Sequence, residues 1–243
     1  MPAAPAAAEP KATPMRDAAS LSVTRPAVRA VLWAEFAALY IGIPLALAFL
    51  LPPSAMWPMM GVALVFAVAV LHRSPGFSWR AQFAWPGRAE WRAIAAFTAV
   101  CGAISFGLVL ALRPDAFLML PLQRPGLWLL ILCAYPLASA FPQEVVWRSL
   151  FFTRYRPLFP TKSAAVAVNA AVFALAHLFF WNWVAMAMTA AGAVIFALAY
   201  LSAGPRRGLV TATILHAVAG AMLFTSGLGV YFYHGAIGGV PGQ

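Results

Sequence analysis

The chain is a succession of long apolar segments, separated by short loops that hold proline and basic residues. A helix needs about 20 apolar residues to cross the hydrocarbon core of a bilayer. Charged residues make up only 9% of the 243 residues, whereas a soluble domain usually carries about 25%. Segment length and composition together predict an all-α fold, a polytopic transmembrane helix bundle of about seven to eight spans.

Seven spans are predicted inside one transmembrane domain, residues 29–243. They lie at 30–51, 56–71, 91–112, 126–148, 164–181, 183–203 and 208–226. Residues 1–28 are rich in Ala and Pro, and we expect them to form a disordered leader. The Gly-rich end, 227–243, is expected to fold back at the membrane interface or to contribute to an eighth span.

The basic residues indicate how the spans are oriented. With the N-terminus in the cytoplasm, 14 of the 16 Lys and Arg residues fall on the cytoplasmic side, Arg148 among them, and only Arg113 and Arg124 fall outside. The positive-inside rule describes such a bias. It predicts an integral protein of the cytoplasmic membrane, and the excess of Arg over Lys suggests a bacterium. Because the basic residues lie in short loops, the net charge of +10 does not indicate a nucleic-acid partner.

Three ionisable side chains lie well inside predicted spans: Glu144 in the fourth, His177 in the fifth and His216 in the seventh. Ionisable groups are costly inside a bilayer and are functional candidates by default. Arg148 follows Glu144 by four residues, so both lie on one helical face. Each residue alone is also compatible with a structural role, as a helix-end ion pair or a buried hydrogen-bonded histidine. Together they predict one polar site in the bundle.

These residues resemble the CPBP family of CAAX-protease and bacteriocin-processing intramembrane endopeptidases. The family pattern is Glu-Glu-x-x-x-Arg, then Phe-x-x-x-His, then His-x-x-x-Asn on successive core spans. The corresponding elements here run from Gln143 through Glu144 to Arg148, from Phe173 to His177, and from His216 to Gly220. The resemblance covers about residues 125–226, and the Pro-Gln-Glu sequence is similar to a bacterial subgroup.

The resemblance implies an intramembrane peptidase that cleaves a membrane-embedded or membrane-tethered protein, with C-terminal processing of exported proteins as one form. Glu144 would be the base, His177 would orient the water or protonate the leaving amine, and His216 would bind the oxyanion. Gln143 replaces the usual first glutamate of the family.

A second departure from the family pattern is Gly220, which replaces an asparagine. Asn169 and Asn182 are candidate replacements for its amide. Asn169 has helical spacing with Phe173 and His177, so we expect these three residues to share a face.

Other interpretations stay open at this stage. Glu144, His177 and His216 could bind zinc, although the metal-free interpretation is favoured because the chain has no HExxH motif. Gln143 and Gly220 are compatible with an inactive scaffold or a bacteriocin-immunity protein of the same fold. The same polar groups could also relay protons in a small transporter.

Overall fold

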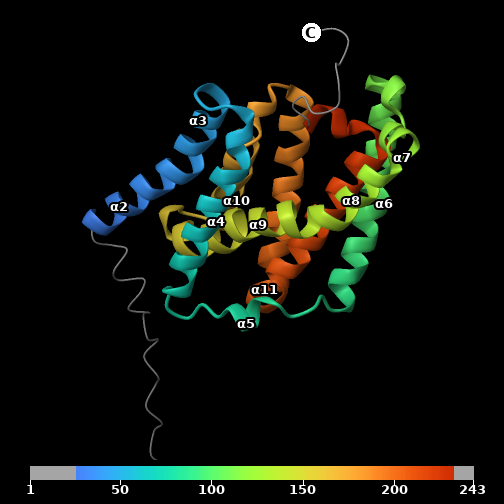
Figure 1. Cartoon of the computed structure of the whole chain (residues 1–243). Helices are drawn as coiled ribbons and strands as arrows, with labels where there is room; N and C mark the ends of the chain where they lie inside the picture. Colours follow the sequence, from blue (N-terminus) through green and yellow to red (C-terminus); the bar gives the residue numbers. More distant parts are fainter. Residues whose placement is uncertain (1–25, 233–243) are drawn as a thin grey trace, which may run out of the picture.

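The structure is a computed structural model that describes residues 26–232, and every regular element in this range is a helix. Six of these helices are long and apolar enough to cross a membrane: Pro26–Phe49, Pro53–His72, Arg88–Leu112, Pro125–Leu158, Lys162–Phe180 and Trp183–Ser226. The prediction of an all-α membrane bundle is therefore confirmed (Figure 1).

The first three spans are close to their predicted positions. The first consists of α2 (Pro26–Ala37), the π-helix η1 (Ala38–Gly42) and α3 (Ile43–Phe49). The short helix η2 (Pro53–Ala55) leads into α4 (Met56–His72), and α5 (Trp79–Gln82) lies in the loop before α6 (Arg88–Leu112). Because α2 begins at Pro26, the last three residues of the predicted leader are helical, and residues 1–25 lie outside the described part.

The fourth span is longer than predicted and runs through the middle of the bundle. After η3 (Pro114–Ala116) and α7 (Met119–Gln123), it comprises α8 (Pro125–Tyr135), η4 (Pro136–Ala140), α9 (Phe141–Glu144), η5 (Val145–Tyr155) and η6 (Arg156–Leu158). Both η4 and η5 are π-helices, and prolines at 136 and 142 interrupt the ordinary hydrogen-bond ladder beside them.

Residues 142–151 of this span are all buried, and η5 packs against α4, α10 and α11. The predicted end of the span at residue 148 was therefore wrong. Arg148 is fully buried in the core and does not belong to a cytoplasmic loop. The sequence suggested that the span ends at residue 148 because an arginine usually marks the end of an apolar span.

The last long helix is two antiparallel segments. After α10 (Lys162–Leu175) and η7 (Leu178–Phe180), α11 (Trp183–Ser226) reverses direction at Gly204, whose φ of 76° and ψ of −177° are not helical. The segments 183–203 and 205–226 then pack together, since the Phe196 and His216 rings stack with centroids 5.0 Å apart. This arrangement agrees with the predicted sixth and seventh spans.

The loops gather at two ends of the bundle. At one end Gln82 donates to the Pro205 carbonyl oxygen (2.7 Å), and the Ala84 amide donates to the Arg206 carbonyl (3.1 Å). At the other end the Leu118 amide donates to the Ser226 carbonyl (2.9 Å). Figure 1 shows α5 and the turn of α11 at the lower end and α7 at the upper end.

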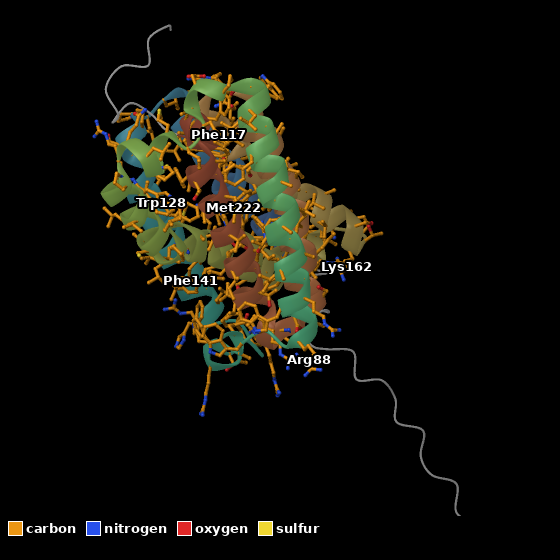
Figure 2. All side chains as sticks on the ribbon, turned by 90° about the vertical axis from the view of Figure 1, so that its right-hand side faces the viewer. Arg88, Phe117, Trp128, Phe141, Lys162 and Met222 are labelled. Carbon is orange, nitrogen blue, oxygen red and sulfur yellow. The ribbon has the colours of Figure 1, made fainter. Side chains whose placement is uncertain are left out.

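The outer surface has the character expected of a protein in lipid. Large apolar side chains such as Val65, Leu130 and Leu137 are exposed. Figure 2 shows carbon-rich side chains along the length of the bundle and nitrogen-bearing ones near its lower end, around Arg88. The helix η8 (Leu228–Phe232) follows Gly227, so the described part of the Gly-rich end forms no eighth span, and residues 233–243 lie outside it.

The hydrogen bonds between the α5 loop and the turn of α11 generate a prediction of topology. Reporter fusions at Gly76 and Pro205 should report the same side of the membrane, and a fusion at Asp115 should report the opposite side. The measurement is alkaline-phosphatase and fluorescent-protein activity of matched fusions. Opposite sides for Gly76 and Pro205 would contradict this arrangement of spans.

Candidate active site

Glu144 and His216 meet in the core of the bundle. The Nδ1 atom of His216 lies 2.8 Å from Oε1 of Glu144, a hydrogen bond between α9 and the second segment of α11. The carboxylate is fully buried and the imidazole nearly so. Since a carboxylate can only accept, Nδ1 carries the proton and the Nε2 atom of a neutral His216 carries a lone pair.

Arg148 is the charge partner of Glu144. Its Nε lies 3.2 Å from the second carboxylate oxygen, Oε2, and both side chains are fully buried. The guanidinium carbon also lies 5.0 Å from the centroid of the Phe173 ring and 5.9 Å from that of Phe196, within the range of cation–π contact. The aromatic faces help to keep this cation in an apolar core.

Asn169 fixes the arginine. Its Oδ1 accepts a hydrogen bond from Nη1 of Arg148 (2.9 Å), and its Nδ2 donates to the Trp147 carbonyl oxygen (2.6 Å). Asn169 is fully buried and is not among the residues that line the cavity described below. It therefore supports Arg148 from α10 and does not reach the cavity as the replacement amide that the sequence suggested.

His177 lies just beyond the end of α10. Its Nδ1 is 2.8 Å from the Phe173 carbonyl oxygen, so Nδ1 donates and Nε2 of the neutral ring has a free lone pair. The Phe173 ring lies between the two histidines, with centroids 4.7 Å from His177 and 5.7 Å from His216. The predicted spacing of Phe173 and His177 thus brings both onto the site.

A cavity of about 910 Å³ opens beside these residues. Most of its wall is apolar, with side chains from α3, α4, α6, α8 and both segments of α11. Its polar lining among the described residues consists of Ser54, Ser105, Tyr135, Ser139, Gln143, His177, Thr189 and His216. None of the described lining residues is Asp, Glu, Lys or Arg, so the two imidazoles provide nitrogen lone pairs on a wall without carboxylates or permanent cations.

Glu144 does not line the cavity, although the sequence led us to expect it there. The neighbouring residue Gln143 does, and its Nε2 donates to Oγ of Ser139 (2.9 Å). Adjacent residues on a helix point about 100° apart. Gln143 therefore faces the cavity while Glu144 faces Arg148 and the back of His216.

Gly220 follows His216 by one helical turn and lies against Tyr135. A Cβ atom built on Gly220 would clash with the Tyr135 ring, at 2.6 Å from Cζ and closer still to Cε1. The absence of a side chain at Gly220 is what allows this ring to pack beside His216, with centroids 6.0 Å apart.

Asn182 does not reach the site, so its expected role as a replacement amide was wrong. Its Oδ1 accepts from the Ala185 amide (2.8 Å) and caps the start of α11, while its Nδ2 donates to the Tyr231 carbonyl (2.7 Å). It ties η8 to α11 at the end of the bundle.

The residues that sequence reasoning missed are Tyr135 and Ser139. With Gln143 they recur at intervals of four, which is helical spacing and could have been noticed. The signal was hidden because Tyr and Ser are common in membrane helices and because Pro136 between them predicts a break.

The donor set was also tested for a metal. Within residues 26–232 no group of three His, Cys, Asp or Glu side chains is arranged to hold one. Oε2 of Glu144 is paired with Arg148, and Nδ1 of His177 is occupied by a backbone carbonyl. These residues do not fit zinc as they stand.

Comparison with known proteins adds one finding. No curated protein and no solved structure matches the chain. A family model described as type II CAAX prenyl endopeptidase Rce1-like matches residues 125–222, which include Glu144, His177 and His216. Over these residues the chain is similar to the Rce1-like family, and this match confirms the predicted resemblance to CPBP intramembrane proteases.

Proposed function

We propose that this chain is an intramembrane endopeptidase in which His216, oriented by Glu144, activates a water molecule in the cavity. The observation that carries the proposal is the 2.8 Å contact between Oε1 of Glu144 and Nδ1 of His216, on a ring that also lines the cavity. A carboxylate bound to one imidazole nitrogen fixes the tautomer and the orientation of the ring, and so leaves the lone pair on the other nitrogen.

The first chemical step would then be proton transfer to Nε2 of His216. As the water oxygen bonds to the scissile carbonyl carbon, its proton passes to Nε2, and Glu144 stabilises the imidazolium that forms. On collapse the carbonyl re-forms, the C–N bond breaks and Nε2 returns the proton to the leaving amine. Nε2 of His177 would accept a hydrogen bond from the second O–H group of the water and so orient it, without taking that proton.

Arg148 supports this role of Glu144. The guanidinium compensates the negative charge of the buried carboxylate, because an uncompensated charge in an apolar core is costly. A carboxylate held by both Arg148 and His216 is better placed to orient the imidazole than to take a proton itself. We therefore assign the base to His216, although the motif alone suggested Glu144.

The cavity suggests the kind of substrate. An apolar wall with a short polar stretch suits an apolar peptide segment or a lipid-modified chain end that reaches the site from the membrane. We propose that the substrate is a membrane-embedded or membrane-tethered protein, cleaved near its C-terminus, and that the enzyme lies in the bacterial cytoplasmic membrane with its N-terminus inside.

Replacing the proposed catalytic groups gives the most direct test. Glu144→Gln, His177→Ala and His216→Ala should each lower the rate of substrate cleavage by about 10²–10⁴-fold, the usual contribution of acid–base catalysis. Combined substitutions should not multiply these losses, because groups that act as a unit fail together. The measurement is turnover of a fluorogenic prenylated CAAX peptide by the purified protein in lipid nanodiscs.

The matched control is Glu35→Gln. Glu35 is a partly buried carboxylate that pairs with Arg154 at 2.7 Å, away from the cavity. This variant should keep the wild-type rate. Unchanged cleavage by Glu144→Gln, with equal protein in the membrane, would remove Glu144 from the mechanism, whereas a wild-type chain that cleaves no peptide would favour the scaffold or transporter interpretation.

Gln143→Glu tests whether the native chain is an impaired relative of the family. If His216 is the base, a carboxylate at position 143 is not needed as a proton acceptor. It also removes the N–H group that donates to Ser139, so the rate of substrate cleavage should not rise. Gln143→Ala should cause only a mild loss. A large gain from Gln143→Glu in the same assay would mean that the native residue has weakened or abolished catalysis.

Metal dependence can be tested by chelation. We propose a metal-free reaction, so the wild-type rate should be unchanged after incubation with 1,10-phenanthroline and dialysis against EDTA. Loss of activity that added Zn²⁺ restores would contradict this and would support zinc bound by Glu144, His177 and His216.

A further inference from the structure

Tyr135, Ser139 and Gln143 form a polar row along the cavity wall. All three side chains line the cavity. Nε2 of Gln143 donates to Oγ of Ser139 (2.9 Å), and the hydroxyl groups of Ser139 and Tyr135 are close enough to interact. The row comes from one span and ends at the phenol, which lies beside His216.

The position of the phenol depends on Gly220. The clash that a Cβ at this position would make falls on the Cε1, Cζ and Cδ1 atoms, the edge of the ring that carries the hydroxyl. Gly220 therefore lets this edge approach the helix one turn after His216. Tyr135 and His216 meet edge to face, with an interplanar angle of 73°.

The direction of the hydrogen bonds along this row leaves the Tyr135 hydroxyl proton available for donation to another group. Because the Gln143 amide donates to Ser139 Oγ, the Ser139 hydroxyl can donate its own proton to the Tyr135 oxygen. The Tyr135 hydroxyl then has its proton to offer to a group in the cavity. The described lining residues include no Lys or Arg that could bind the same group in place of the Tyr135 hydroxyl.

We propose that Tyr135 is a catalytic residue whose hydroxyl donates a hydrogen bond to the oxyanion of the tetrahedral intermediate. The inference rests on the proposed function. When water attacks, the π electrons of the scissile carbonyl move to its oxygen, and the Tyr135 hydroxyl donates to that oxygen without giving up its proton. The same electron pair re-forms the carbonyl when the C–N bond breaks.

A phenol suits this position for two reasons. It is a stronger donor than an aliphatic hydroxyl, and it is pre-oriented by the packing on Gly220 and by Ser139. In a largely apolar cavity a fixed donor contributes more than it would in water. Loss of one such donor typically lowers kcat by about 10²–10³-fold.

The test compares Tyr135→Phe with Tyr200→Phe. The first keeps the ring against Gly220 and removes only the hydroxyl, while Tyr200 is an equally large, buried tyrosine outside the cavity lining. We expect Tyr135→Phe to lower kcat by about 10²-fold with little change in KM. Tyr200→Phe should keep the wild-type kcat, and the thermal unfolding midpoints of the two variants should be similar.

Two substrates are used with the full chain in nanodiscs: the prenylated CAAX peptide and a fluorogenic single-span apolar helix. Wild-type cleavage that His216→Ala abolishes but Tyr135→Phe leaves unchanged would overturn this inference alone. A wild-type chain that cleaves neither substrate would overturn the proposed function and the inference with it.

If Tyr135→Phe is poorly folded, a second pair of variants tests whether Tyr135 supplies a hydrogen-bond donor. Tyr135→Ala should lose the donor and empty the space beside Gly220. Adding Gly220→Asn to it places an amide N–H donor in that space, and the double variant should be at least about tenfold faster than Tyr135→Ala, a partial return of the donor's contribution. Equal rates for the two variants would overturn the proposal.

Discussion

The pairing of the buried Glu144 carboxylate with Arg148 and His216 is the interaction on which the rest of the site depends. In an apolar core the carboxylate must be paired, and the structure gives it a guanidinium on one oxygen and an imidazole on the other. Removing one partner of such a buried pair costs about 3–5 kcal/mol. The contacts of Arg148 with Asn169, Phe173 and Phe196 follow from the same need, since they stabilise the cation that stabilises the carboxylate.

The irregular fourth span makes this pairing compatible with an open cavity. Its buried middle is surrounded by α4, α10 and α11, so successive residues face different neighbours without reaching lipid. Gln143 can therefore face the cavity while Glu144 faces Arg148. A regular helix at the edge of the bundle would have exposed one of them to the membrane, where an unpaired polar group is costly.

The sequence predicted most of what depends on hydrophobicity. Spans follow from apolar length, and Glu144 and His216 stood out because so few ionisable groups lie inside spans. The depth of Arg148 could not be predicted, since its position reflects charge pairing and not helix length. Asn182 was misassigned because an asparagine after a helix serves equally as a cap. Tyr135 was missed because its position depends on Gly220, which is distant in the sequence. Only a residue without a side chain at 220 leaves room for the Tyr135 ring.

Gln143 and Gly220, the two departures from the family pattern, become related once the geometry is known. An amide at 143 cannot take a proton, so in the proposed mechanism the base is the imidazole that Glu144 holds. That amide is a donor, which orders Ser139 and in turn Tyr135. The glycine at 220 admits the phenol that this row ends on. Both departures thus fit the proposed mechanism, in which an imidazole takes the proton and a phenol faces the developing charge.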